Sequence, residues 1–173
     1  MGFFLLVKRP VLWYIWIWQR KLGEIAVHRK FMLEALAEAR LALEAGEVPV
    51  GAVVVLDGEI IGRGHNLREV NQDPTAHAEI LAIQEAARRL GSWRLTNADI
   101  YVTLEPCPMC AGAIVNARLR RLVFGAYDPK AGAVVSLMNV VQDRRLNHTV
   151  EVMDGICQRE CADLLQEFFQ RLR

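Results

Sequence analysis

Residues 100–116 read IYVTLEPCPMCAGAIVN, a sequence that changes from a strand pattern to a helix pattern within a few positions. The segment from Ile100 to Leu104 is apolar and partly β-branched, which is typical of a strand. Pro106 interrupts this pattern. A helix is then expected to begin at Cys107, with Pro108 in its first turn, where the missing N–H is harmless. A strand followed closely by a helix is the unit from which layered α/β domains are built.

The same alternation of strands and helices continues on both sides of this stretch. Further strands are expected at 50–56, 59–64, 121–126 and 150–153. Further helices are expected at 31–45, 76–90 and 161–172. Asp57-Gly58 is a tight-turn pair that joins the first two strands as a hairpin, and Gly46 and Gly91 are placed to end two of the helices. The pattern therefore predicts one α/β domain in which several connections are crossovers.

Two short motifs lie at the openings of two predicted helices and suit a metal ion. Cys107 and Cys110 are three residues apart, so their sulfurs point to the same side of a helical turn, and His77 can add a nitrogen from the neighbouring helix. Three protein ligands leave one tetrahedral position open, as in catalytic zinc sites. Glu79 lies two residues after His77, where a carboxylate can serve as general acid and base for a metal-activated water.

Each motif has a plainer interpretation when it is taken alone. A single Cys-x-x-Cys pair in a cytosolic protein is more often a redox or structural metal motif, and a lone histidine is usually a core or surface residue. The combination at two helix openings is far more specific than either part. It predicts a zinc-dependent hydrolase.

These motifs match the signature His-x-Glu with Pro-Cys-x-x-Cys, which defines the zinc-dependent cytidine and nucleobase deaminases. The surrounding sequence resembles the bacterial tRNA-specific adenosine deaminases (the TadA family) within that superfamily. The stretches that carry the resemblance are 48–52, 73–80, 101–113, 123–126, 132–133, 136–138, 147–148, Cys161 and Phe168-Phe169. The resemblance extends from about residue 31 to the end of the chain.

The resemblance implies a three-layer α/β/α cytidine-deaminase-like fold with a central five-stranded mixed sheet. It also implies a cytoplasmic homodimer that holds one Zn²⁺ per subunit and binds a tRNA anticodon stem-loop. The implied reaction is hydrolytic deamination of the wobble adenosine, position 34, to inosine in tRNA-Arg with an ACG anticodon. Zinc-activated water would attack C6 of the flipped adenine.

The resemblance also assigns roles to single residues. His77, Cys107 and Cys110 match the zinc ligands, and Glu79 matches the proton shuttle. Asn66 matches an asparagine that contacts the flipped base, and Val50 matches a residue of the base pocket. The implied RNA contacts are Asp128, Lys130, Asn147, Phe169 and Arg173. His65, Leu67 and Tyr127 depart from the family pattern at the expected RNA-contacting rim.

Several of these residues have structural alternatives. Asn66 follows a glycine-containing strand end, where asparagine often only caps a turn. Phe168 and Phe169 are adjacent on a helix, so at most one faces the core, and the other is a dimer contact or a stacking surface for RNA. Arg118, Arg120 and Arg121 are more typical of a solvated helix end than of a nucleic-acid patch. Cys157 and Cys161 are interpreted as buried thiols in a reducing cytoplasm.

The first thirty residues differ in composition from the rest. The formal net charge of the 173 residues is +1, but residues 1–31 carry +5 and the remainder −4, and three of the four Trp lie in this first segment. The chain is therefore divided into a leader at 1–30, outside the resemblance, and a zinc-dependent deaminase domain at 31–173. The apolar runs of the leader are too short for a transmembrane helix, and neither a signal peptide nor a myristoylation motif fits. It is either an appended or misassigned segment before a start near Met32, or an interfacial segment at a membrane surface without stable insertion.

Two other functions compete with tRNA editing. One is deamination of a free base or nucleoside, such as guanine or cytosine; the segment from Gly132 to Phe169, which follows the tRNA-editing relatives, disfavours it. The other is an inactive zinc module that only binds RNA or a protein partner. Glu79 disfavours this one, because a purely structural site does not need a carboxylate beside an open coordination position.

Overall fold

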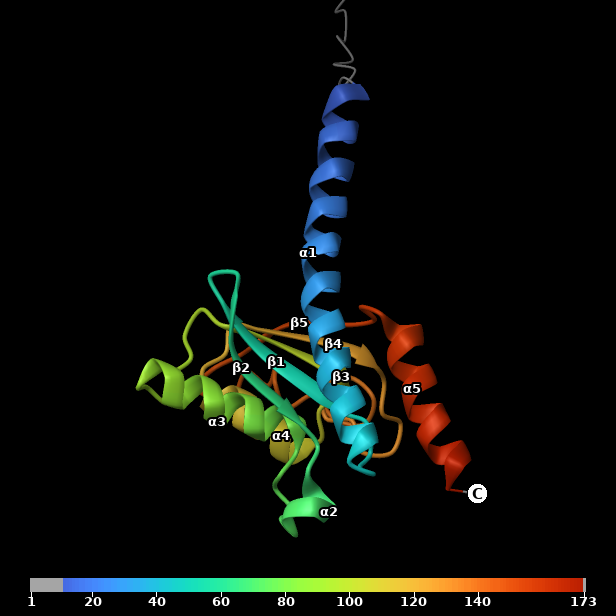
Figure 1. Cartoon of the computed structure of the whole chain (residues 1–173). Coiled ribbons are helices and arrows are strands. Elements are labelled where there is room, and N and C mark those ends of the chain that lie inside the picture. The colour runs from blue at the N-terminus through green and yellow to red at the C-terminus, as the bar shows by residue number, and fades with distance from the viewer. Residues whose placement is uncertain (1–10, 173) are drawn as a thin grey trace, which may run out of the picture.

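The structure is a computed structural model that describes residues 11–172 of the chain. The helices in this range are α1 (Val11–Glu44), α2 (Arg68–Asn71), α3 (Ala78–Leu90), α4 (Pro108–Asn116) and α5 (Gln158–Arg171). The strands are β1 (Gly51–Leu56), β2 (Glu59–His65), β3 (Asp99–Leu104), β4 (Arg121–Ala126) and β5 (Glu151–Met153). Figure 1 shows a central sheet with helices on both sides and a long α1 that extends beyond it.

The five strands form one mixed sheet in the order β2-β1-β3-β4-β5. Strand β1 is antiparallel to both β2 and β3, whereas β3, β4 and β5 run parallel to one another. The register places Val53 opposite Tyr101 and Tyr101 opposite Val123. Parallel neighbours require crossover connections. Helix α4 connects β3 to β4, and the loop of residues 127–150 connects β4 to β5. The predicted five-stranded mixed sheet is therefore confirmed.

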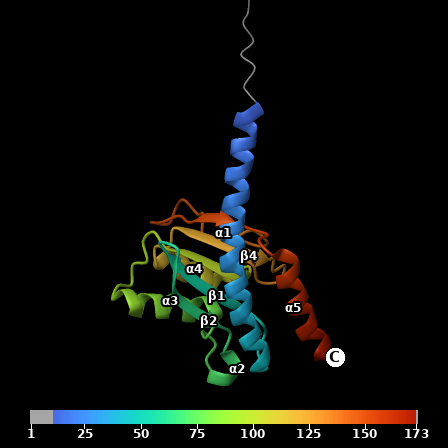
Figure 2. The same ribbon diagram turned by 45° about the horizontal axis from the view of Figure 1, so that its top comes forward.

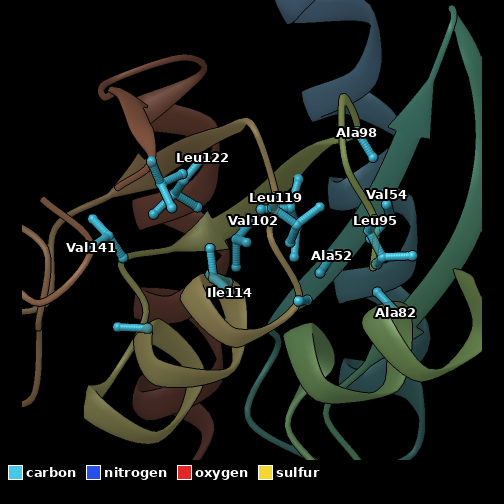
Figure 3. Close-up of a cluster of buried hydrophobic side chains, with 14 of the residues drawn as sticks. Ala52, Val54, Ala82, Leu95, Ala98, Val102, Ile114, Leu119, Leu122 and Val141 are labelled. Atoms are coloured by element: carbon cyan, nitrogen blue, oxygen red, sulfur yellow. The ribbon is translucent and has the colours of Figure 1, made fainter. Parts of the chain in front are cut away.

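Alternate residues of the strands face two separate cores. Val53 and Tyr101 pack against α1 and α5 on one face, in a cluster that includes Met32, Leu36 and Leu164. The opposite face packs against α3 and α4. Figure 3 shows part of this second core, in which the labelled side chains include Val54, Ala82, Val102, Ile114 and Leu122. Two helical layers enclose one sheet, as the three-layer α/β/α prediction requires.

Small residues allow the helices to approach the sheet closely. A Cβ atom at Gly51 on β1 would lie 2.1 Å from the Ala35 carbonyl oxygen and 2.3 Å from the Ala39 nitrogen of α1. A Cβ atom at Gly62 on β2 would lie 2.3 Å from the Ala82 carbonyl oxygen of α3. These backbone contacts hold both helices near the strands that lead into the candidate site.

The strands agree with the sequence predictions to within one residue at either end. Two helical predictions need correction, and one short helix was missed. The helix predicted at 31–45 begins at Val11, the helix predicted at 161–172 begins at Gln158, and the four-residue α2 was not predicted. Hydrophobic periodicity did not indicate that α1 begins at Val11, because the first eight residues, VLWYIWIW, are all apolar and do not alternate with polar residues.

Helix α1 continues without a break through residue 30, so the proposed boundary between the leader and the deaminase domain falls inside a helix. His28 on this helix is buried, and its Nδ1 lies 2.9 Å from the Tyr101 hydroxyl of β3. Before that point α1 projects away from the layers, as Figures 1 and 2 show. None of the helices in the described range is long and apolar enough to span a membrane.

Candidate active site

The two motifs predicted to bind a metal lie at the N-termini of α3 and α4. His77 is the N-cap residue of α3 and Cys107 is the N-cap residue of α4, and both have extended backbone angles. Pro108 occupies the first turn of α4, as the sequence predicted. The turn before His77 is held by Asp73, whose carboxylate accepts hydrogen bonds from the Thr75 amide and hydroxyl, both at 2.7 Å. A turn held by Asp73 therefore precedes the first motif, and Pro108 opens the helix of the second.

The three predicted ligands come together with their donor atoms facing one another. His77 Nδ1 lies 3.7 Å from Cys107 Sγ and 3.5 Å from Cys110 Sγ, and all three donor atoms lie within 4.8 Å of one another. A tetrahedral zinc with ordinary Zn–S and Zn–N bond lengths would place sulfur and nitrogen about 3.6 Å apart. The residues therefore fit a zinc ion, and three ligands leave room for one more.

The two thiols have unequal acidity. The pKa of Cys107 is lowered to about 4, first by a hydrogen bond from Cys110, and also by His77. The pKa of Cys110 is raised, first by its hydrogen bond to Cys107 and then by burial. The pKa of His77 is raised, first by its hydrogen bond with Cys107. The cluster thus already favours a thiolate on Cys107, and thiolate is the form that binds zinc.

Glu79 lies in the first turn of α3 and is almost fully buried beside this cluster, with 4% of its surface exposed. Burial raises its pKa, and this effect outweighs the opposing influence of its own backbone N–H and of His77. A carboxyl group with a raised pKa can accept a proton and return it near neutral pH. The environment of Glu79 is therefore suited to general acid–base catalysis.

A cavity of about 210 Å³ opens onto two of the three potential ligands, His77 and Cys107, and onto Glu79. The third, the buried Cys110, does not line the cavity, but its sulfur lies within 4.8 Å of the donor atoms of the other two. Of the residues predicted to bind substrate, Val50, Asn66 and Asp128 line it. The other lining residues are Val48, Arg68, His77, Ala78, Glu79, Leu104, Glu105, Cys107 and Ala131. The structure therefore places the predicted base-binding residues and the predicted chemical groups around one cavity.

Glu47 is a buried residue of this region that the sequence interpretation missed. Its Oε2 accepts a hydrogen bond from the Asn66 amide at 3.2 Å, and its Oε1 accepts one from the Val70 N–H at 2.8 Å. The Asn66 backbone N–H also donates to the Val50 carbonyl at 3.0 Å. Asn66 thus does more than cap a turn, because Glu47 fixes its side chain in the cavity wall.

Glu105 is a second buried carboxylate that was missed, although it stands in the motif beside Pro106. It accepts hydrogen bonds from the backbone N–H groups of Asp128, Val134, Val135 and Ser136, and from the Ser136 hydroxyl. These bonds hold the loop that contributes Asp128 and Ala131 to the cavity. A Cβ atom at Gly132 would lie 2.4 Å from the Glu105 carboxylate, so the loop closes tightly over it.

The remaining predicted RNA contacts do not line the cavity. Lys130 is exposed on the loop after Asp128, and Asn147 accepts a hydrogen bond from Arg118 at 2.8 Å on another part of the surface. Phe169 is half exposed on α5, whereas Phe168 is buried, as their adjacency on a helix predicts. Arg173 lies outside the described residues.

Comparison with known proteins agrees with this geometry. A profile of the MafB19-like deaminase family matches residues 26–173. A tRNA-specific adenosine deaminase of Bacillus subtilis (strain 168) is 56% identical over 143 residues, which cover 83% of this chain and 89% of that protein.

Solved structures show the same fold. A tRNA:A34 deaminase, described for A-to-I editing at the wobble position of transfer RNA, matches with a TM-score of 0.75 and 50% identity, covering 78% of this chain and 98% of that one. A guanine deaminase from Bacillus subtilis matches with a TM-score of 0.56 and 42% identity, covering 58% of this chain and 64% of that one. The chain belongs to the MafB19-like deaminase family and, within it, to the tRNA-specific adenosine deaminases.

Proposed function

We propose that this protein deaminates adenosine 34 to inosine in the ACG anticodon of tRNA-Arg. The observation that carries the proposal is the cavity that joins a three-ligand metal group, a buried Glu79 and the fixed amide of Asn66. The proposed substrate class, tRNA, rests on the sequence similarity to tRNA-specific adenosine deaminases. In the overall reaction water adds its oxygen to C6 of adenine, the bond from C6 to the exocyclic nitrogen breaks, and ammonia leaves.

His77, Cys107 and Cys110 would hold one zinc ion per subunit. Bound there, zinc would supply Lewis acidity that lowers the pKa of a water molecule toward neutrality. Glu79 would take the proton from the attacking water and deliver it to the departing amino group, which then leaves as neutral ammonia. Its burial beside the ligands excludes bulk water from both proton transfers.

Asn66 would orient the extruded base. Its amide N–H donates to Glu47, so its carbonyl oxygen remains available to a hydrogen-bond donor in the cavity. Val50 supplies an apolar wall beside it. A flipped base needs such a preformed pocket, because unstacking already costs a few kcal/mol.

The rest of the anticodon stem-loop would contact the surface around the cavity. Asp128 lies at its rim and Lys130 follows on the same loop. Asn147, Phe169 and Arg173 would contact RNA farther from the reacting base. The exposed ring of Phe169 offers a face on which a base can stack.

We also propose that two copies associate through the outer side of α4. Met109 is an exposed apolar side chain of α4, and the loop between β4 and β5 exposes four more: Val135, Leu137, Met138 and Leu146. Leu146 and Gly112 line one shallow cavity of about 460 Å³, so α4 and the loop share a surface. Sedimentation should give the mass of a dimer, and a Leu146→Glu variant should shift it toward the monomer. None of the four cysteines is in a disulfide, which is compatible with the cytoplasmic location that we propose.

The decisive experiment incubates the zinc-loaded protein with this tRNA and, separately, with free adenosine, cytidine and guanine. Inosine at position 34 of the tRNA alone is the expected result. Turnover of free bases alone would replace the substrate assignment with that of a base deaminase, the activity named for the guanine deaminase neighbour. That neighbour covers less of this chain than the tRNA-editing deaminase does.

Glu79→Gln tests the proposed chemistry directly. The variant should bind zinc with unchanged stoichiometry and lose about 10²- to 10⁴-fold in turnover, because it can no longer transfer the proton. Glu85→Gln, which changes an exposed carboxylate on the same helix, is the matched control and should retain activity. Zinc loss in Glu79→Gln would instead show that Glu79 has a structural role.

A further inference from the structure

The first half of α1 exposes large apolar side chains that no part of the described chain covers. Trp18 is 66% exposed, Leu22 is 57% exposed and Ile25 is 50% exposed. Their spacing of four and three residues places them along one side of the helix. In Figures 1 and 2 this part of α1 extends well beyond the sheet.

The apolar character extends around the whole helix toward its N-terminus. The eight helical positions from Val11 to Trp18 read VLWYIWIW, and successive helical residues are turned by about 100°, so apolar positions fall on every side. A protein partner would cover one face of such a helix, whereas lipid hydrocarbon surrounds all of it. Eight residues measure only about 12 Å, which fits within one leaflet and cannot cross a hydrocarbon core of about 30 Å.

Basic residues flank this apolar segment in the sequence. Lys8 and Arg9 precede it, Arg20 and Lys21 follow it, and residues 1–31 carry a net charge of +5. Three Trp residues lie in the same segment, and Trp favours the boundary between lipid headgroups and hydrocarbon. Cations next to a short apolar segment complement anionic lipid headgroups, and each contributes about 1 kcal/mol near such a surface.

We propose that the projecting part of α1, residues 11–25, binds the surface of membranes that contain anionic lipids. The apolar positions from Val11 to Trp18 enter one leaflet, and Leu22 and Ile25 lie at the interface. This is peripheral binding without a membrane-spanning helix. It makes the protein a deaminase that is held at a membrane surface.

The attachment of α1 to the domain directs the active site away from that surface. His28 lies against Tyr101 and Arg121, near the starts of β3 and β4. Cys107 instead follows the last residue of β3, at the opposite end of the strand. Because α1 leaves the domain near the end at which β3 begins, a bound membrane would lie on the side opposite the cavity and leave the cavity open to RNA.

The test uses the full-length chain and vesicles of phosphatidylcholine, with or without phosphatidylglycerol. We expect the protein to sediment with phosphatidylglycerol vesicles and to remain in solution with neutral ones. A triple variant, Trp18→Ser with Leu22→Ser and Ile25→Ser, should lower the partition coefficient at least about tenfold, since three apolar side chains no longer enter the interface. Arg20→Glu with Lys21→Glu should remove the preference for anionic lipid.

Leu33→Ser with Leu41→Ser is the matched control, because these residues are 43% and 45% exposed on the same helix where it covers the sheet. This variant should bind vesicles like the unchanged protein. Circular dichroism and urea unfolding establish that every variant is folded.

Three outcomes would overturn the proposal. The first is equal sedimentation with neutral and anionic vesicles, or none with either. The second is a change of oligomeric mass in the triple variant without a change in vesicle binding. This result would show that Trp18, Leu22 and Ile25 contact a second copy of the chain. The third is a loss of tRNA affinity in the triple variant while vesicle binding is unchanged, which would assign it to RNA. The first two results do not depend on which nucleic acid the enzyme edits.

Discussion

Glu47 uses both of its carboxylate oxygens, one for the Asn66 amide and one for the Val70 N–H. In Glu47→Ala both donors lose their acceptor, and each unsatisfied buried donor costs about 1–3 kcal/mol. We expect the free energy of unfolding, measured with urea, to fall by at least that amount. We also expect KM for tRNA to rise more than kcat falls, because Asn66 would no longer be held against the base.

Glu47→Gln separates positioning from general stability. The glutamine side chain has the same shape but only one acceptor oxygen. Compared with Glu47→Ala, this variant should regain most of the lost stability, and its KM should lie between those of Glu47→Ala and the unchanged protein. Equal KM values for the Ala and Gln variants would contradict the positioning role.

His28 makes stability depend on pH. Burial lowers its pKa below the ordinary value of 6.5, and the neighbouring Arg121 lowers it further. Arg121 can only donate toward the ring, at 3.4 Å from Nε2, so Nδ1 carries the proton and donates to the Tyr101 hydroxyl. The other charged groups that act on the ring are Asp99 and Glu24, which raise its pKa, and Arg120, which lowers it.

The lowered pKa of His28 determines how the free energy of unfolding changes with pH. Above pH 6.5 the ring is neutral in the folded and the unfolded chain, and this contribution to stability is complete. As the pH falls below 6.5, the unfolded chain binds a proton before the folded chain does, so the free energy of unfolding decreases. Urea unfolding at pH 7.5 and pH 5.5 should show a smaller difference for His28→Gln than for the unchanged protein. An equal difference would place the pH dependence elsewhere.

The central residues of the site could be predicted because their chemistry has a fixed spacing. His77, Glu79, Cys107 and Cys110 lie at helix openings. The structure places the first three around one cavity and brings Cys110 within 4.8 Å of His77 and Cys107. Glu47 could not be predicted, because it lies in a loop and its partner Asn66 is near it only after β1 and β2 pair. Long-range contacts of single polar residues leave no periodic signal in the sequence.

Close packing between α1 and β1 gives a prediction at the level of elements. In Gly51→Ala the new methyl group would meet the Ala35 carbonyl and the Ala39 nitrogen of α1. Neither backbone atom can rotate away, so α1 must shift, at a cost of about 1–3 kcal/mol or more. Thermal unfolding should show a lower melting temperature.

Gly23→Ala is the control for this substitution, because Gly23 lies on the same helix with nothing within 4 Å of its Cβ position. An alanine there should stabilise the helix by up to about 1 kcal/mol. A melting temperature for Gly51→Ala equal to that of the unchanged protein would show that α1 is only loosely held on the sheet.

Helix boundaries show where sequence periodicity succeeds and where it fails. Helix α3 is amphipathic, and its C-terminal end at Gly91 was predicted correctly. Helix α1 was predicted only from Phe31 onward, where it covers the sheet. Its first eight positions, VLWYIWIW, are uniformly apolar and show no alternation, so periodicity gave no sign that the helix begins at Val11.

The charge distribution of the whole chain predicts how binding responds to salt. The segment after residue 31 has a net charge of −4, so its overall charge does not favour RNA and we expect tRNA to be bound through a small number of local contacts. We expect the logarithm of affinity to fall with the logarithm of salt concentration with a slope of about −2 to −4, equivalent to only a few neutralised phosphates. Fluorescence anisotropy with labelled tRNA at several salt concentrations measures this slope.

Deletion of residues 1–27 should leave the slope unchanged, since the basic segment of α1 faces away from the cavity. A much steeper slope that becomes shallow on deletion would show that this segment binds RNA.

The separation of the metal ligands along the chain also bears on the order of folding. Strands β1 and β2 form a local hairpin, but His77 meets Cys107 only after α3 and β3 have crossed over and β3 has joined the sheet. Contacts distant in sequence form later than local ones, because a longer loop must be closed first. We therefore expect the three potential ligands to come together only once the sheet is assembled around β3, so a metal ion would bind at a late step of folding.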